Sequence, residues 1–378
     1  MSAKYLYPWL GLCLLLLLGC SGNRKKKTVD ENLTYTEMEV KYAQGFTVKD
    51  YGDYKLVDVQ DPLGENSSIY HYAFVKRGTS PQGIPTEYEQ VEVPIRSAVC
   101  MTTLQLSNFA KLEAEDRVVG ITSTRFLFNE AVNRQLKEGK THKIGIEGDF
   151  DNELVIAINP DVILVSPFKK GGYESIKNLG IPLISFLGYK EVTPLGQAEW
   201  IKFTGALLGL EEEAKASFAK IEQRYLSLKD LVKDEKGKPT VLSGELHSGN
   251  WYVVGGKSYL AMLFKDAGGK YFMDNDSESG GFYTDFETVY SQGAKADYWR
   301  ILNSFDGEYS YDILRKSDER YIDFDAYKNK KVIYCNLREV SFYEKTPVEP
   351  EVVLADLIKI FYPHLLPDHE PVYYYLLK

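Results

Sequence analysis

A long helical stretch divides the chain into two similar series of elements. Residues 211–233 carry apolar side chains at steps of three and four, with charges between them, and Lys236-Gly-Lys-Pro239 ends the pattern. A helix of this length spans about 35 Å, which is long for a crossover inside one α/β unit. We therefore predict that this helix joins two lobes.

Short apolar strands alternate with helices on both sides of it, a pattern typical of parallel α/β sheets. The strands expected in the first series are 95–100, 118–121, 163–166 and 182–186, and the helices are 105–112, 129–138, 173–179 and 194–208. The second series has strands at 240–243, 251–254 and 331–334, and helices at 259–266, 286–293 and 352–362. Upstream, 46–59 and 70–75 alternate apolar and polar residues around a turn at Asp61-Pro62, which predicts a β-hairpin.

The predicted fold class is therefore α/β, with two α/β lobes joined by a single long helix and an N-terminal β-hairpin extension. The mature chain is longer than a single hydrophobic core usually supports, which also favours two lobes. The expected segments are a signal peptide (1–20), a tether (21–40), a β-rich extension (41–91), an N-terminal lobe (92–208), the lobe-spanning helix (209–236) and a C-terminal lobe (237–378).

The first residues predict export. An apolar run from Trp9 to Gly19 follows Lys4, which is the layout of a secretory signal. At about eleven residues the run is too short to cross a bilayer as a helix. Leu17-Leu-Gly-Cys20 resembles the bacterial lipobox, in which the cysteine is diacylated and becomes the first residue of the mature protein. The alternative is an ordinary secreted protein in which Cys20 is idle.

Net charge and cysteine content limit the kinds of partner and the cross-links that we expect. The net charge of −9 becomes one unit more negative when Lys4 leaves with the signal, which argues against nucleic acid as a partner. Beyond Cys20, the mature chain has only Cys100 and Cys335, which lie far apart in apolar strand-like runs. They could pair in an oxidising compartment, but we predict two buried free thiols.

One segment carries a family resemblance. Asn152-Glu153-Leu-Val-Ile-Ala-Ile-Asn-Pro160-Asp161-Val-Ile-Leu resembles the N-L-E-x-I-x-A-L-x-P-D-L-V-I segment of periplasmic substrate-binding proteins for ferric siderophores, haem and cobalamin. Further similar segments follow the family order across about residues 92–362: Val118-Val-Gly-Ile, Gly180-Ile-Pro-Leu-Ile, Leu207-Leu-Gly-Leu-Glu-Glu-Glu-Ala214, Gly255-Gly-Lys-Ser-Tyr with Asp266-Ala-Gly-Gly269, and Asp285-Phe-Glu287.

The resemblance implies a periplasmic lipoprotein, anchored to the inner or outer membrane, that binds a chelate in the cleft between two lobes. It implies delivery of an iron chelate or cobalamin to the permease of an ABC importer and, through it, to the ATPase subunit. It also implies no catalytic residues and no intrinsic cofactor. The alternative function is a periplasmic enzyme, such as a chelatase or esterase, but no nucleophile elbow or placed catalytic set supports it.

The resemblance further implies that one exposed Glu on each lobe docks with Arg residues of the permease. The matching positions are Glu153 and Glu287, although Asn152 stands directly before Glu153 without the intervening Leu of the family. Read from the residues alone, each is an acid in the first turn of a helix, where the helix dipole favours it.

Candidate ligand residues come from the loops expected after strand ends. They are the cations Arg125, Arg300 and Arg338, the aromatic residues Phe126, Phe168, Tyr189, Trp251, Tyr252 and Trp299, and His247. This mixture suits an anionic or macrocyclic metal complex without choosing between them. Trp251 and Trp299 could instead be core residues, and His247 could ligate iron or cobalt or be structural. No spacing matches a zinc site, so no metal site is predicted.

Overall fold

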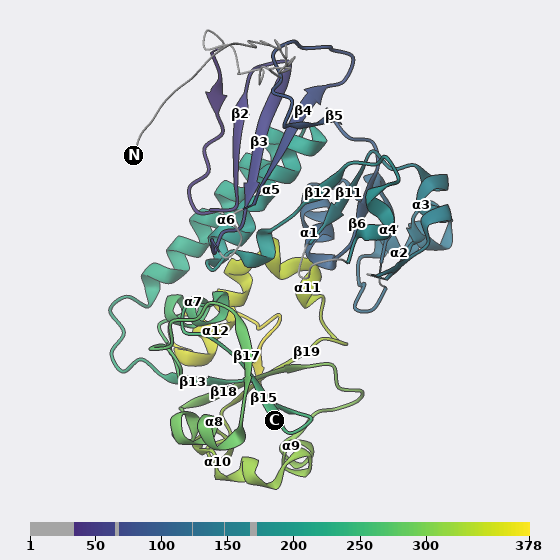
Figure 1. Cartoon of the computed structure of the whole chain (residues 1–378). Helices are drawn as coiled ribbons and strands as arrows, with labels where there is room; N and C mark the ends of the chain where they lie inside the picture. Colours follow the sequence, from purple (N-terminus) through teal and green to yellow (C-terminus); the bar gives the residue numbers. More distant parts are fainter. Residues whose placement is uncertain (1–33, 65–67, 123, 147, 167–171) are drawn as a thin grey trace, which may run out of the picture.

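The computed structural model describes residues 34–64, 68–122, 124–146, 148–166 and 172–378. A β-sheet extension, an N-terminal lobe and a C-terminal lobe follow one another along the molecule (Figure 1). The signal peptide with Cys20 and most of the predicted tether lie outside the described residues, as does Phe168. In the part that is described, no helix has the length and apolar character needed to cross a bilayer.

The extension is a five-stranded sheet, larger than the hairpin predicted from the sequence. Its strands, in spatial order, are β1 (Thr36–Glu37), β2 (Phe46–Asp50), β3 (Tyr54–Gln60), β4 (Ile69–Lys76) and β5 (Glu89–Val93). The predicted hairpin is β3–β4, and β5 pairs parallel with β4. One face of the sheet packs on helix α5 (Pro194–Leu208) through side chains such as Phe46 and Phe74, whose rings contact Phe203.

The N-terminal lobe is built on a parallel sheet of order β12-β11-β6-β7-β8. Its strands are β6 (Ala98–Cys100), β7 (Val118–Ile121), β8 (His142–Lys143), β11 (Val162–Val165) and β12 (Leu183–Ser185). A short hairpin, β9 (Gly145–Ile146) with β10 (Asp149–Phe150), leads into α3. The helices are α1 (Thr103–Lys111), α2 (Glu130–Lys137), α3 (Asn152–Ile158) and α4 (Glu174–Lys177).

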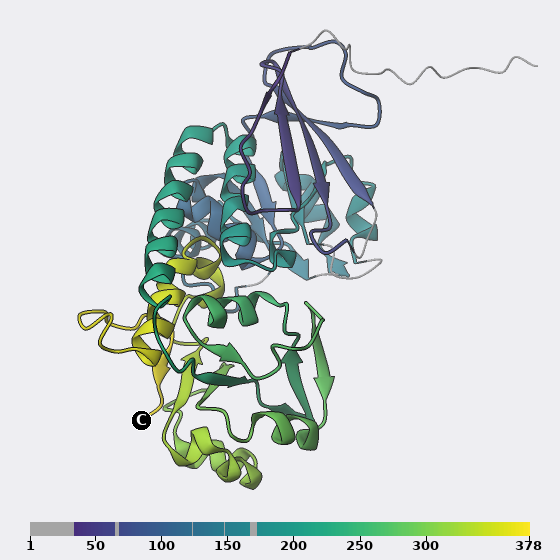
Figure 2. The same ribbon diagram turned by 90° about the vertical axis from the view of Figure 1, so that its left-hand side faces the viewer.

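Helices α5 (Pro194–Leu208) and α6 (Glu211–Leu231) lie side by side and connect the two lobes (Figure 2). The buried residues of α6 recur at the predicted three- and four-residue steps, from Ala214 to Leu228. Gly205 lets the two helices meet, because a Cβ there would lie 2.6 Å from that of Ala214. Helix α6 also packs on α12 (Pro350–Phe361) of the C-terminal lobe, so it bridges both lobes as predicted.

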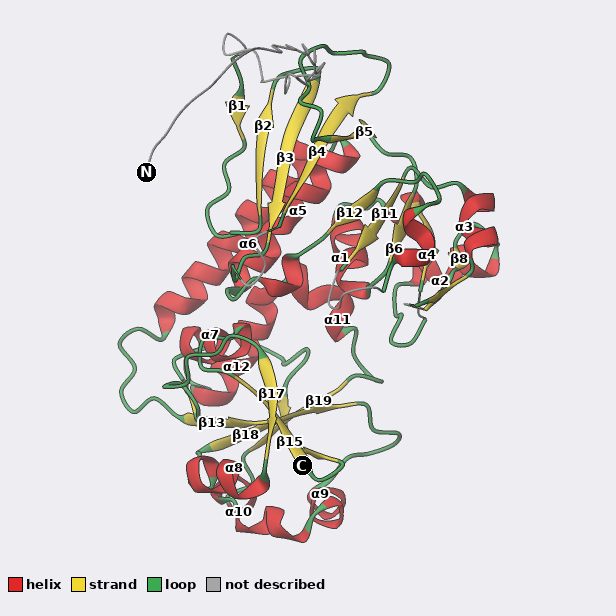
Figure 3. Ribbon diagram, viewed as in Figure 1, coloured by secondary structure: helices red, strands yellow, loops and turns green. Residues whose placement is uncertain are grey.

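The C-terminal lobe holds two sheets (Figure 3). One has the order β16-β13-β18-β19-β20, with β16 (Lys270–Tyr271), β13 (Thr240–Ser243), β18 (Tyr298–Asn303), β19 (Val332–Asn336) and β20 (Tyr375–Leu376). The other contains β14 (Leu246–His247), β15 (Asn250–Val254) and β17 (Gly281–Thr284). The helices include α7 (Tyr259–Asp266), α8 (Phe286–Gly293), α9 (Tyr311–Ser317), α10 (Asp325–Lys328) and α11 (Phe342–Lys345). The expectation that Trp299 and Arg300 lie in a loop is therefore wrong, because both residues belong to β18.

Both remaining cysteines are buried free thiols, as predicted. Burial raises the pKa of both thiols, that of Cys335 to about 12. Because the thiolate is the reactive form, we expect Ellman's reagent to label neither residue at pH 8 in the native protein beginning at Ser21. Both should react after unfolding in guanidinium, and rapid labelling of the native protein would contradict this arrangement.

Candidate functional site between the two lobes

Loops that follow parallel strands of both lobes meet at one place. Residues 124–128 follow β7, Ser304 follows β18 and Arg338 follows β19. The carboxyl ends of parallel strands are where α/β proteins bind ligands. A hollow of about 370 Å³ lies here, lined by Thr124, Arg125, Phe126, Leu127, Phe128 and Arg338.

Two guanidinium groups that line this hollow, one from each lobe, converge on Ser304. Arg125 Nη2 donates to the Ser304 hydroxyl at 3.3 Å, and Arg338 Nε donates to the Ser304 carbonyl at 3.2 Å. The carboxylate of Asp306 lies 3.7 Å from Arg338 Nη1, but its side chain is 89% exposed. An ion pair so exposed to water is weak, so it offsets little of the charge of Arg338.

Phe126 forms an aromatic wall in a strained conformation. Its φ of +63° lies in the left-handed region, which is unusual for an aromatic residue. Its ring centroid lies 4.7 Å from the Arg125 guanidinium, a cation–π geometry. Backbone strain of this kind costs of order 1–3 kcal/mol and clusters at functional sites.

Glu344 ties the loop to the opposite lobe. Its carboxylate, on α11, accepts hydrogen bonds from the backbone N–H groups of Phe128, at 3.0 and 3.1 Å, and Asn129, at 3.2 Å. Burial raises the pKa of this carboxyl group, and the two N–H donors act in the opposite direction. Glu344 was not predicted, because no local pattern marks an acid that accepts backbone hydrogen bonds from residues more than 200 positions away.

Arg300 provides a third cation on the C-terminal lobe. Its Nε and Nη2 atoms donate to the Tyr374 hydroxyl at 3.0 and 2.7 Å. Within the described residues, no carboxylate oxygen lies within 4 Å of this guanidinium. Burial raises the pKa of Tyr343, and the nearby Arg300 acts in the opposite direction. This guanidinium is therefore bonded to a phenol, and the partly buried carboxyl group of Glu245 lies near enough to interact with it electrostatically.

Tyr252 presents an exposed ring on the same lobe. It is 43% exposed and packs edge-on against Tyr283, which is 66% exposed, at 5.3 Å. The ring lies over Gly281, where a Cβ would fall 1.9 Å from the Tyr252 hydroxyl, so a side chain at 281 would displace it. Tyr283 was not among the predicted ligand residues, because strand β17 was not predicted.

Trp251 and Trp299 are core residues, and the prediction that they line the ligand site is corrected. Both are fully buried, with ring centroids 5.7 Å apart, and both contact Tyr321 and Phe324. Their indole N–H groups are satisfied by the backbone carbonyls of residues 243 and 244 at 3.0 and 2.8 Å. Their surroundings are thus complete without a ligand.

The other predicted ligand residues are dispersed. Tyr189, in a 3₁₀ turn (Gly188–Lys190), is partly buried and packs against the core. His247 is exposed at the end of β14, beside the tight turn to β15. Across the described residues, no three His, Cys, Asp or Glu side chains gather closely enough to hold a metal ion.

The two predicted docking acids occupy equivalent places in the two lobes. Glu153 is exposed in the first turn of α3, after the N-cap Asp151. Glu287 lies in the first turn of α8, after the N-cap Asp285, with its side chain 78% exposed and 3.9 Å from Arg320. Both acids are therefore available to a partner on the outer surface.

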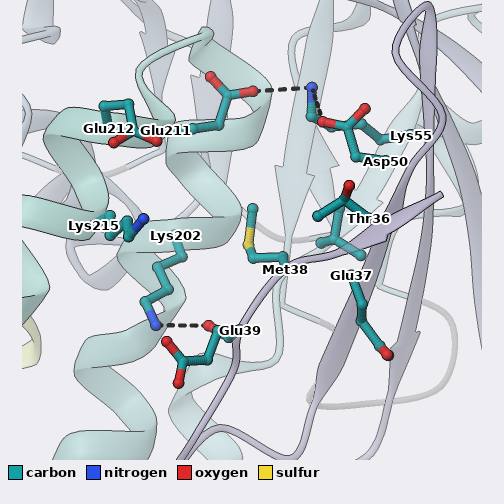
Figure 4. Close-up of a pocket in the computed structure, with 11 residues that line it drawn as sticks. Thr36, Glu37, Met38, Glu39, Asp50, Lys55, Lys202, Glu211, Glu212 and Lys215 are labelled. Atoms are coloured by element: carbon teal, nitrogen blue, oxygen red, sulfur yellow. Dashed lines mark hydrogen bonds and ion pairs between the residues drawn. The ribbon is translucent and has the colours of Figure 1, made fainter.

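A second hollow, of about 310 Å³, lies between the extension and the paired helices (Figure 4). Lys55 bridges it, with its ammonium 3.2 Å from Asp50 and 3.1 Å from Glu211. Its lining is Thr36, Glu37, Met38, Glu39, Val48, Asp50, Lys55, Lys202, Glu211, Glu212 and Lys215. Because it touches only the extension, α5 and α6, it is separate from the site between the lobes.

The two α/β lobes, the bridging helix and the cleft between the lobes define a ligand-binding protein of the periplasmic type. The sequence profile of the periplasmic binding protein family matches residues 99–338, and the chain belongs to this family. The extension lies outside that match.

The chain shares sequence with several relatives and its fold with several solved structures. The chain is 25% identical over 288 residues to an uncharacterized lipoprotein of Methanocaldococcus jannaschii, covering 73% of this chain and 67% of the relative. A second uncharacterized lipoprotein of that organism is 23% identical over 387 residues, covering 97% and 96%. The structure matches the TroA-like periplasmic binding protein FepB of Veillonella parvula with a TM-score of 0.57 and 20% identity, covering 76% and 96% of the two chains. It matches a periplasmic heme binding protein of Pseudomonas aeruginosa with a TM-score of 0.57 and 18% identity, covering 71% and 94%.

Proposed function

We propose that this protein is the substrate-binding lipoprotein of an ABC importer. It captures an iron chelate, either a siderophore complex or haem, or cobalamin, in the cleft between its lobes, and delivers it to the permease. The observation that carries the proposal is the meeting of Arg125 and Arg338, one from each lobe, in a single hollow. The protein would be held to the inner or outer membrane, on its periplasmic side, by acyl chains on Cys20.

The charge of the hollow favours an anionic ligand. Guanidinium groups bind carboxylate and other oxyanions through paired hydrogen bonds, which give both affinity and orientation. The carboxylates of a haem or the oxygens of a ferric siderophore supply such acceptors. A corrin ring would instead rely on aromatic contacts with Phe126 and Tyr252.

Arg300 supplies a further guanidinium group for an oxyanion, deeper in the C-terminal lobe. A guanidinium largely removed from water is unfavourable, and a ligand oxyanion would offset part of that cost. Tyr252 and Tyr343, which are 43% and 38% exposed, could contact the ligand beside it. Phe168, Tyr189 and His247 remain proposed contacts.

A ligand that touches both lobes would favour the arrangement that brings them together, because it gains contacts there that the open form lacks. The permease would recognise this form through Glu153 and Glu287, each paired with an arginine of the permease. The missing leucine before Glu153 is the point at which this chain departs from the family pattern.

The test is calorimetric titration of the protein beginning at Ser21 with haemin, a ferric catecholate, a ferric hydroxamate and cyanocobalamin. We expect one of them to bind with one-to-one stoichiometry and to be recovered unchanged. Arg125→Gln and Arg338→Gln should each weaken binding about tenfold or more, which corresponds to at least about 1.4 kcal/mol. Arg315→Gln, at an exposed arginine on α9, is the matched control and should leave affinity unchanged.

Two outcomes would contradict the proposal. Absence of binding by all four compounds would reject the chelate assignment. Hydrolysis of the siderophore, or release of its metal with repeated turnover, would favour the alternative, a periplasmic esterase or chelatase.

A further inference from the structure

The turn between β2 and β3 lies at the end of the extension farthest from the C-terminal lobe (Figure 1), and stacked tyrosines gather at this turn. Tyr35 precedes β1, and the pairing of Thr36 with Asp50 places it beside the turn between β2 and β3. The Tyr35 ring lies 5.3 Å from that of Tyr51, which stacks on Tyr54 at 4.9 Å and 7°. We call this group the tyrosine end.

The tyrosine end exposes an aromatic ring and ammonium groups, with the acids Glu37, Asp50 and Asp53 beside them. Tyr35 is 48% exposed, and the Lys49 ammonium lies 5.3 Å from its ring centroid. Lys76 is also exposed at this end, where its N–H bonds the carbonyl of Asp53, the exposed acid of the turn. Tyrosine rings accumulate at the headgroup level of membranes, and lysine can extend its apolar stem while its ammonium stays among lipid phosphates.

The tyrosine end is fixed to the N-terminal lobe. The strand-like segment that follows β1 is pinned by two carboxylates of the lobe: Glu199 accepts the N–H groups of residues 41–43, and Glu191 accepts those of residues 44–45. Lys55 adds an ion pair from β3 to Glu211 on α6. A surface that binds the tyrosine end therefore also fixes the orientation of the N-terminal lobe.

The chain itself limits how far this end can lie from a membrane anchor. Tyr35 is fifteen residues after Cys20, and a fully extended chain of that length spans at most about 50 Å. Tethering raises the local concentration of a weakly binding surface, so modest contacts suffice to populate the bound state.

We propose that the tyrosine end is a membrane-contact surface, which seats the extension on the lipid headgroups and so orients the N-terminal lobe above the bilayer. The proposal rests on the lipid anchor of the proposed function. It assigns the extension, which the family profile does not cover, a role that the tether alone cannot perform.

The test measures contact with lipid directly. Trp200, Trp251 and Trp299 are fully buried and give a constant background, so a new tryptophan reports its own surroundings. The acylated protein with Tyr35→Trp is placed on phosphatidylethanolamine and phosphatidylglycerol vesicles whose acyl chains are brominated near the headgroup. The matched control is Tyr283→Trp, an exposed position on the C-terminal lobe.

We expect the bromines to quench the added emission at position 35 at least twofold and to leave that at 283 unchanged. Adding Lys49→Gln to the Tyr35→Trp protein should reduce the quenching. Equal quenching at both positions, or none at either, would overturn the proposal.

A second arm separates this surface from the anchor. The protein beginning at Ser21 is held on the same vesicles by an N-terminal histidine tag and a nickel-chelating lipid, and the same two positions are compared. If the chain expressed in bacteria from its first residue fails to sediment with vesicles, the lipid anchor is rejected, while the tagged protein still reports contact at position 35. If both forms sediment and position 35 is not quenched, the anchor stands and the contact surface is rejected.

Discussion

Replacing Glu199 by alanine is expected to lower the free energy of unfolding by about 3–5 kcal/mol, the cost of breaking a buried ion pair from one side. The Glu199 side chain is fully buried on α5. Its carboxylate accepts N–H groups from Lys41, Tyr42 and Ala43 at 2.6–3.0 Å, and the Lys202 ammonium lies 2.7 Å away. The substitution leaves a buried cation and three backbone donors without their acceptor.

The contacts of Glu199 also predict how much of the lost unfolding free energy comes from Lys202 and how much from the backbone N–H groups. Lys202 also donates to the carbonyl of Glu39 at 2.7 Å, so it keeps one partner when Glu199 is removed. The double variant Glu199→Ala/Lys202→Met removes the stranded cation and should recover part of the loss. The rest should remain, because the N–H groups of residues 41–43 still lack an acceptor.

Urea unfolding followed by tryptophan fluorescence measures these differences. The matched control is Glu212→Ala, an exposed acid on α6, which should change the unfolding free energy by no more than about 0.5 kcal/mol. If Glu199→Ala is as stable as the control, the carboxylate does not fasten the extension. That result would also remove the rigid connection on which the orienting role of the tyrosine end depends.

Periodicity predicted the regular elements well where local pattern and packing agree. α5, α7 and α8 begin and end at the predicted residues, and α6 buries the predicted stripe. Each has one apolar face or an apolar run bounded by a clear cap, such as Thr193 or Ser258, so the chain itself encodes its limits. β18 was missed although Tyr298–Asn303 is rich in residues that favour strands.

The candidate site was predictable only in part. Arg125 and Arg338 follow strands, and strand order brings such loops together, so chain position was enough to select them. Ser304 was missed because the strand before it was missed. Glu344 bonds residues 128 and 129 of the other lobe, a contact that only the packing of α11 on the N-terminal lobe creates.

Two adjacent residues of one strand, Trp251 and Tyr252, show most clearly what the sequence alone does not predict. Successive side chains of a strand point to opposite faces, but the sequence does not say which face is buried when both residues are aromatic. In β15, Trp251 points into the core and Tyr252 points outward. Which face of β15 is buried depends on the residues that contact Trp251, chiefly Trp299, Tyr321 and Phe324. These residues come from distant parts of the chain.

These two neighbours should therefore respond in opposite ways to the same substitution. Trp251→Ala should lower the free energy of unfolding by about 3–5 kcal/mol, because it opens a cavity among aromatic side chains and leaves the carbonyl of residue 243 without its indole donor. Tyr252→Ala loses only an exposed cross-strand pair with Tyr283, which contributes about 0.2–1 kcal/mol. Its expected effect is instead on ligand binding, with affinity for the chelate about tenfold weaker, or about 1.4 kcal/mol.

Urea unfolding and calorimetric titration of both variants separate stability from binding. Tyr252→Phe is the control for Tyr252→Ala, because it keeps the ring over Gly281 and removes only the hydroxyl. Retained affinity in Tyr252→Phe would assign the contribution to the ring face, as expected for a macrocyclic or aromatic chelate. Equal losses in the two variants would assign it to the hydroxyl and so to an oxyanion of the ligand. Unchanged binding in Tyr252→Ala would exclude Tyr252 from the ligand site and leave the arginines of the interlobe hollow as its principal contacts.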